Sequence, residues 1–324
     1  MPAEWAPHEM TLVAWPQREE AWRGTTIEEA RDTHAEVVAA IADFEPVLLV
    51  VAPDQTADAR RRVPSGNVEI FEAPIDDSWL RDSGPIIVTG EGRRAGVDFV
   101  FNGWGEAFHP FDNDAAVAAR ILDHLGIERI PVDMVLEGGS IAVDGQGTLV
   151  TTSQCLLDPS RNPDLDRAAI EEKLAGALNV DDFVWLDRGL VEDGDTDGHV
   201  DNVFAFTEPG KGLLQTAPEG DPNHENSKEN ARLLREAGIE VVELDLLPRI
   251  DRDGEPIVVP YTNFYIANGA LIVPVSGMDP DMDAQALELL GRLYPGREAV
   301  GIDGRTLALG GGGIHCITQQ VPAV

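Results

Sequence analysis

Apolar residues occur along the chain at two alternating spacings, one typical of helices and one typical of buried strands. Residues 28–44 carry apolar side chains at helical spacing, and the run Val47–Val51 that follows is entirely apolar. The same order recurs along the sequence. We predict helices at 28–44, 55–62, 114–125, 165–178, 227–237 and 283–293, followed by strands at 47–51, 68–71, 130–133, 183–187, 241–245 and 299–303. The pattern therefore predicts an α/β protein.

Five polar segments that contain glycine follow these strands. Their anchor residues are 55, 62, 69 and 48 positions apart, and they are Asp82, Glu137, His199, Asn268 and Cys316. This loose period predicts repeated supersecondary units that close around an axis, each contributing one segment to a common centre. A doubly wound sheet is the main alternative, but no Gly-x-Gly-x-x-Gly opens a helix after a strand.

The charge of the chain limits its partners. Its 58 acidic residues against 24 basic ones give a net charge of -34, which excludes a nucleic acid and disfavours an anionic membrane surface. Only three of the basic residues are lysines, Lys173, Lys211 and Lys228. An acid-rich, lysine-poor composition resembles that of proteins from salt-accumulating halophiles, and an acidic mesophilic surface is the alternative.

Cysteine content and hydropathy predict the compartment. Two cysteines cannot build a disulfide framework, the first residues lack the pattern of a signal peptide, and no run reaches the roughly 18 apolar residues of a membrane helix. We therefore expect a soluble cytoplasmic protein that forms a single catalytic domain over residues 1–324.

Cys316 is the first candidate for chemistry, because four glycines at 310–313 precede it closely. A thiol in such a setting can act as a nucleophile if a neighbour lowers its pKa. His315 is adjacent in sequence and would point to the opposite side of an extended segment, so we expect the base to be His199. On a strand, His199 and Asp201 would share one face. Cys155 has no glycine setting, and we assign it a structural role as a small buried side chain.

Two further carboxylates occupy unusual positions. Asp82 lies in Trp79-Leu-Arg-Asp-Ser-Gly-Pro85, and Glu137 lies between Leu136 and a Gly-Gly turn. Taken singly, a surface ion pair and turn chemistry would explain them. Three carboxylates and a histidine could also bind a metal, but no His-x-x-x-His or Asp-x-Asp-x-Asp spacing is present, so we expect no metal site.

The combination of a thiol with several acids favours a cationic substrate. Carboxylates raise the pKa of a thiol, whereas a bound guanidinium would pair with the carboxylates and favour the thiolate. A small cationic guanidine is therefore the substrate class that this set of residues predicts.

Motifs along nearly the whole chain resemble those of the agmatine deiminase family, in the superfamily of enzymes that modify guanidino groups. The motifs are Pro2–Trp5 with His8-Glu9, Trp15-Pro16, Trp79–Pro85, Phe101–Gly105, Leu136–Ser140, Arg161–Pro163, Gly198–Asn202, Asn263–Gly269 and Gly310–Gln320. The resemblance implies a five-bladed α/β propeller, the pentein fold, made of ββαβ-type units around a pseudo-fivefold axis.

The resemblance also implies a role for each site residue. Cys316 matches the family's nucleophile, His199 its acid and base, and Glu137 the acid that holds the histidine and the guanidinium. The pair that grips the guanidinium nitrogens is matched by Asp82 and Asp201, and Trp79 is placed to stack on the cation. No metal and no organic cofactor is implied, and the resemblance allows a homodimer or larger assembly.

The predicted reaction is hydrolysis of agmatine to N-carbamoylputrescine and ammonia, a step of putrescine biosynthesis, through a thiouronium on Cys316. Glu106, Asp197 and Ser153-Gln154 depart from the family pattern, outside the five catalytic positions. Free arginine or peptidyl-arginine therefore remain alternative substrates, and amidino transfer is an alternative reaction. A metallohydrolase and an inactive polyamine-binding protein are hypotheses of other classes.

Overall fold

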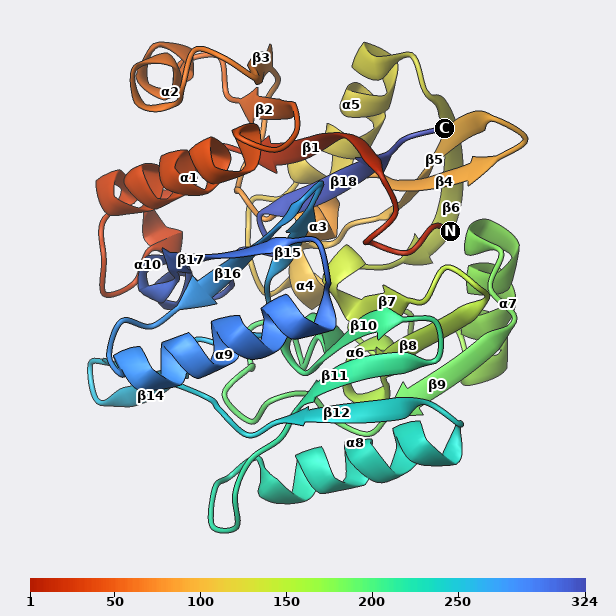
Figure 1. Ribbon diagram of the computed structural model, residues 1–324. Helices are drawn as coiled ribbons and strands as arrows, with labels where there is room; N and C mark the ends of the chain where they lie inside the picture. The colour runs from red at the N-terminus through yellow and green to blue at the C-terminus, as the bar shows by residue number, and fades with distance from the viewer.

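The computed structural model describes residues 1–324 and contains five small sheets that repeat one pattern (Figure 1). In each sheet the first two strands pair antiparallel, a helix crosses over, and the third strand pairs parallel with the second. Four ββαβ units therefore follow one another along the chain after the first. The second unit consists of β4 (Ile86–Gly90), β5 (Arg93–Val100), α5 (Val117–Leu125) and β6 (Glu128–Val135), and the third of β7 (Ile141–Val143), β8 (Thr148–Thr152), α7 (Arg167–Leu178) and β9 (Asp182–Leu186). The fourth unit consists of β10 (Phe204–Glu208), β11 (Lys211–Gln215), α8 (His224–Glu236) and β12 (Glu240–Leu244). The fifth consists of β15 (Tyr265–Ala267), β16 (Ala270–Val275), α9 (Pro280–Leu293) and β17 (Glu298–Asp303).

The first unit is completed by the C-terminal strand. β18 (Thr318–Pro322) pairs antiparallel with β1 (His8–Ala14), and β1 pairs parallel with β2 (Val47–Val51) after α1 (Ile27–Ala42). A further helix, α2 (Thr56–Arg62), leads to the edge strand β3 (Val68–Glu72). Figure 1 shows β18 in blue beside β1 in red. The two ends of the described chain thus share one sheet, which closes the ring of five units.

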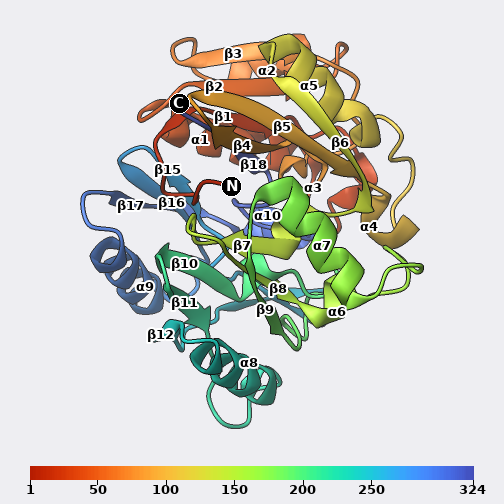
Figure 2. The same ribbon diagram turned by 90° about the vertical axis from the view of Figure 1, so that its right-hand side faces the viewer.

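The crossover helices lie outside the sheets (Figures 1 and 2). Local sequence determines where several of them begin and end. The Thr26 hydroxyl accepts from Glu29 N–H, and the Glu29 carboxylate accepts from Thr26 N–H, which forms a capping box at the start of α1. Gly126, at a φ of +63°, ends α5 in the left-handed conformation. None of the helices has both the length and the apolar character needed to cross a bilayer.

Short elements lie in the connections between units. These are α3 (Leu80–Ser83), α4 (Gly103–Glu106), α6 (Ser153–Leu156), α10 (Arg305–Gly310), the hairpin strands β13 (Arg249–Arg252) and β14 (Glu255–Val258), and the 3-10 turns η1 (Glu19–Ala21), η2 (Asp114–Ala116), η3 (Gly138–Ser140) and η4 (Val200–Asn202). The largest apolar cluster joins α1, β1 and β2 to β15, β16 and α10, so the last unit packs against the first.

Candidate active site

Each of the five connections between neighbouring units contributes a buried polar side chain to one region. Asp82 follows β3, Glu137 follows β6 and His199 follows β9, whereas Asn263 precedes β15 and Cys316 precedes β18. All five side chains belong to residues that are at most 6 % exposed. The predicted arrangement, one chemical segment from each repeat at a common centre, is therefore observed.

Gly139 marks the point where three of the predicted residues meet. A Cβ added to Gly139 would lie 2.6 Å from His199 Nδ1, 2.8 Å from Asp201 Oδ2 and 2.9 Å from Asp82 Oδ1. Those contacts are shorter than a carbon atom tolerates. A glycine is thus required here so that the imidazole and both carboxylates can approach one another.

Asp82 lies on the short helix α3 and is buried. Its Oδ2 accepts from Trp104 Nε1 and its Oδ1 from Gly139 N–H, each at 2.9 Å, while His199 Nδ1 lies 3.8 Å away. Burial raises the pKa of Asp82; His199 opposes this shift, and Asp201 adds to it. The surface ion pair with Arg81 does not form, because Arg81 is itself buried and donates to Gln319 and Gln320.

His199 and Asp201 do not lie on a strand, so that part of the prediction was wrong. Residues Val200–Asn202 form the 3-10 turn η4, which places both side chains at the same centre by a different geometry. Burial alone would lower the pKa of His199, but Asp82, Asp201, Glu137 and Asp193 outweigh it and raise that pKa. His199 Nε2 and Asp201 Oδ1 are buried and have no hydrogen-bond partner.

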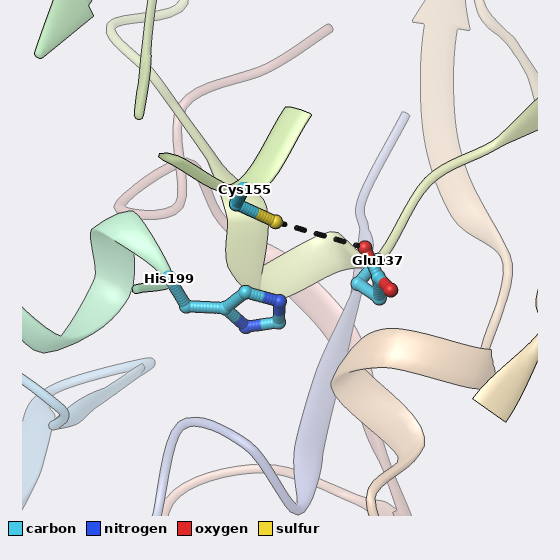
Figure 3. A group of neighbouring side chains, drawn as sticks. All are labelled: Glu137, Cys155 and His199. Carbon is cyan, nitrogen blue, oxygen red and sulfur yellow. Dashed lines mark hydrogen bonds between the residues drawn. The ribbon is translucent and has the colours of Figure 1, made fainter. Parts of the chain in front are cut away.

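Glu137 is paired with an arginine that the sequence analysis did not assign to the site. Arg161 Nε donates to Glu137 Oε1 at 3.1 Å, and the same guanidinium also pairs with Asp197. Cys155 lies on the other side of Glu137, with its Sγ 3.9 Å from Oε2 (Figure 3). Cys155 is indeed fully buried, as predicted, but its surroundings are polar on one side, which the sequence did not indicate.

Cys316 is enclosed by polar groups. The amide Nδ2 of Asn263 donates to Cys316 Sγ at 3.3 Å, and Asp201 Oδ2 lies 3.8 Å from the sulfur. Burial and the nearby Asp201 and Asp82 raise the pKa of the Cys316 thiol well above its usual value, and the Asn263 amide acts in the opposite direction. These surroundings therefore favour the thiol form of Cys316 over the thiolate.

The glycine run before Cys316 has a steric explanation. A Cβ on Gly312 would lie 2.5 Å from the ring of Trp79, and one on Gly313 would meet the side chain of Asn263. These glycines let the segment pass directly behind the indole and the amide. The special backbone that the sequence analysis expected here thus serves close packing at the site.

A cavity of about 230 Å³ leads from the surface to Cys316 and Asp82. Its aromatic walls are Trp79, Trp104 and Phe108, and its outer part contains the half-exposed ion pair between Arg23 and Asp195. Trp79 thus lines the cavity, and its stacking on a cation stays a prediction.

Three site residues could not be singled out from sequence alone. Asn263, Arg161 and Asp193 each contact a predicted residue, and Asp193 Oδ2 accepts from His199 N–H at 3.1 Å. Asn263 is the first residue of the motif Asn263–Gly269, in which the sequence analysis chose Asn268 as the residue that reaches the centre. The Asn268 anchor was wrong, because its side chain binds the backbone of His8 and its N–H donates to Glu45.

The fold and the site together define a pentein, a ring of five ββαβ units around a central thiol, imidazole and carboxylate cluster. The solved structure of the N-terminal domain of ArgZ, an arginine dihydrolase, is similar to this chain in fold only. Its TM-score is 0.60 at 14 % sequence identity, and the match covers 97 % of this chain and 98 % of that chain.

Within that class, the chain belongs to the family described as Porphyromonas-type peptidyl-arginine deiminase, whose model matches residues 1–322. The agmatine deiminase of Pseudomonas aeruginosa is 41 % identical, covering 100 % of this chain and 95 % of the relative. That of Medicago truncatula is 39 % identical, covering 100 % and 96 %. A solved structure of agmatine deiminase from Enterococcus faecalis has a TM-score of 0.94 at 34 % identity, covering 100 % of this chain and 95 % of that chain.

Proposed function

We propose that this protein is a hydrolase that converts agmatine and water into N-carbamoylputrescine and ammonia. The observation that supports this most directly is the placement of Cys316 in a cavity where Asp82 and Asp201 surround the thiol. Full-length similarity to agmatine deiminases, at 38 % to 41 % identity, agrees with it.

Substrate binding would use the excess negative charge of the site. The guanidinium group would lie between Asp82 and Asp201, whose Oδ1 is buried without a partner and is free to accept an N–H. The aromatic wall formed by Trp79 would cover the face of the cation. Because the bound positive charge offsets the two carboxylates, the pKa of Cys316 would fall, and the thiol would lose its proton to solvent as the thiolate forms in the complex.

The first chemical half would form a carbon–sulfur bond. The Cys316 thiolate attacks the guanidinium carbon, and a nitrogen of the resulting tetrahedral adduct takes a proton from His199. The carbon–nitrogen bond then breaks and ammonia leaves, which gives a thiouronium on Cys316. The raised pKa of His199 keeps the proton available for this step.

The second half would release the product. Neutral His199 removes a proton from water, and the hydroxide attacks the thiouronium carbon. The carbon–sulfur bond of the adduct then breaks to leave the thiolate, and the hydroxyl proton of the adduct passes to water as the ureido carbonyl forms. Glu137 would hold the histidine, and Arg161 in turn fixes Glu137 through the hydrogen bond at 3.1 Å.

The decisive measurement is release of ammonia and a ureido product from agmatine, free arginine and a peptidyl-arginine. We expect agmatine to be the preferred substrate and Cys316→Ala to lose at least about 10⁴-fold in kcat. Turnover of arginine with none of agmatine would overturn the choice of substrate. Transfer of the amidino group to an added amine, without ammonia-coupled hydrolysis, would overturn the reaction type.

The setting that we propose is the cytoplasm of a salt-accumulating cell, where N-carbamoylputrescine would supply polyamine synthesis. This rests on the net charge of -34 and on the scarcity of lysine. Activity retained in molar potassium chloride and lost at low salt would support it. Sedimentation in the same buffers would decide whether the chain forms a homo-oligomer.

A further inference from the structure

Cys155 is a second buried thiol beside the reaction centre, and the proposed hydrolysis has no use for it. It lies on α6, is fully enclosed, and approaches Glu137 Oε2 to 3.9 Å. Figure 3 shows its sulfur, the carboxylate of Glu137 and a ring nitrogen of His199 turned toward one another. These are a thiol, a carboxylate and an imidazole, which together form a donor set that borderline-soft divalent cations prefer.

The separations of the three donors approach those of a tetrahedral site. One ligand atom from each residue lies within 4.8 Å of the other two. Zinc bound at about 2.0 to 2.3 Å from its ligands holds neighbouring donors about 3.5 Å apart. The sulfur–oxygen separation of 3.9 Å is already close to that value. A movement of about 1 Å, within the reach of a side-chain rotation, would bring the imidazole to the same spacing.

The remaining bonds of these side chains leave the necessary atoms free. Arg161 occupies Glu137 Oε1, so the other oxygen of that carboxylate remains directed at Cys155. His199 Nδ1 lies 3.8 Å from Asp82 Oδ1, whereas Nε2 is buried and has no partner. An unpartnered imidazole nitrogen is costly to bury, and a metal ion would satisfy it.

The local charge also favours a cation at this position. Asp82, Asp193 and Asp201 surround the ring of His199, and Arg161 is the basic side chain that pairs with Glu137. A divalent ion would therefore enter an acidic environment and would displace the thiol proton of Cys155 on binding.

We propose that Cys155, Glu137 and His199 form an inhibitory site for a thiophilic divalent cation such as Zn²⁺. The ion would occupy Nε2 of His199 and an oxygen of Glu137 at the same time, so the imidazole ring could no longer take up the second proton that it donates in the proposed reaction. The expected inhibition of hydrolysis by zinc rests on the proposed function, whereas the expected binding of zinc does not. Hard cations such as Mg²⁺ and Ca²⁺ prefer oxygen ligands and would not compete here.

The test separates binding from catalysis. Zinc affinity is measured by competition with a chromogenic chelator in the Cys316→Ala protein, with millimolar Mg²⁺ present to occupy surface carboxylates. We expect one Zn²⁺ per chain. Adding Cys155→Ala should weaken binding more than about tenfold, because even outer-shell changes cost 10- to 100-fold. Zinc affinity that is unchanged by Cys155→Ala, or that is already absent in Cys316→Ala, overturns the proposal.

A second arm measures ammonia release. Zn²⁺ should inhibit the unaltered enzyme reversibly, with recovery on addition of a chelator, while the Cys155→Ala enzyme keeps its turnover and resists zinc at least about tenfold better. Equal inhibition of the two proteins contradicts the proposal. If agmatine is not turned over at all, the proposed function fails, and the binding arm still decides whether the zinc site exists.

Discussion

His315 Nδ1 lies 2.9 Å from Asp201 Oδ2, so the residue next to Cys316 orients a carboxylate and does not face the thiol. Its Nε2 lies 3.0 Å from both carboxylate oxygens of Glu4. Burial and Arg81 lower the pKa of His315, and Glu4 and Asp201 outweigh them and raise it. The N-terminal segment therefore supports Asp201 through an imidazole.

Replacing His315 should weaken substrate binding more than catalysis. In His315→Gln, Asp201 loses a hydrogen bond to a charged donor, a contribution of about 1.5 to 3 kcal/mol, so KM for agmatine should rise about tenfold or more. The drop in kcat should be smaller. His124→Gln, which changes a partly exposed histidine on α5, is the control. An unchanged KM in His315→Gln would show that Asp201 holds its position without the imidazole.

A single added methyl group at Gly139 should disrupt the centre. Gly139→Ala would press against His199, Asp201 and Asp82 at 2.6 to 2.9 Å. A displacement of about 1 Å costs about 100-fold in rate, so kcat/KM should fall by at least that factor while the melting temperature changes little. Gly66→Ala is the matched control, because a Cβ there meets nothing within 4 Å. Full activity of Gly139→Ala would mean that the three side chains do not act together.

Asn263 should control how readily the nucleophile ionises. Its amide N–H donates to Cys316 Sγ at 3.3 Å and lowers the pKa of that thiol. Removing it in Asn263→Ala should raise the pKa of Cys316 further and slow alkylation by iodoacetamide about tenfold near pH 8. The measurement is the pH profile of alkylation in a Cys155→Ala background, where Cys316 is the remaining thiol. An unchanged profile would assign the amide a purely structural role.

Neutral His34 should contribute stability that is lost as the pH falls below neutrality. This residue is fully buried in α1 against the edge of Trp22, and burial lowers its pKa to about 4, which its bond to the Ala30 carbonyl opposes. The unfolded chain binds the proton more tightly, so the contribution of neutral His34 is lost as pH falls through 6.5 toward 4.

Between about pH 7 and pH 5 this linkage amounts to about 2 kcal/mol. Urea unfolding at both values should show that His34→Leu loses less stability on acidification than the unaltered protein, by about that amount. Many carboxylates titrate in both proteins, and their contribution to the loss of stability cancels when the two proteins are compared. Equal losses would mean that the imidazole keeps an ordinary pKa in the folded state.

Much of the fold could be predicted because each crossover helix and its parallel strand carry a strong local pattern. The predicted strand at 47–51 coincides with β2, and the helix predicted at 165–178 begins only two residues later, at Arg167. The antiparallel strands, such as β7 with three residues, are too short to give a periodic signal. The closure of the ring by β18 depends on contacts more than 300 residues apart, as in the pair Leu12 and Gln319, and no local pattern encodes them.

The sequence predicted the central residues of the candidate site, but it did not predict the residues that hold them in place. Cys316, His199, Glu137, Asp82 and Asp201 stand in glycine-bearing motifs, and the structure gathers all of them. Arg161 is a contact of Glu137 across 24 positions, and its role appears only once the two connections meet. Asn263 and Asn268 share one motif, and tertiary placement alone distinguishes the one that contacts the sulfur.

The closure of the first sheet by β18 has a consequence for the order of synthesis. Cys316 lies in the last of the five connections, two residues before the strand that pairs with β1. A chain emerging from the ribosome carries Asp82, Glu137 and His199 well before it carries this thiol. The thiol therefore joins the carboxylates and the imidazole only late in synthesis, after the other four connections have been made, and the ring closes around the complete site as its final step.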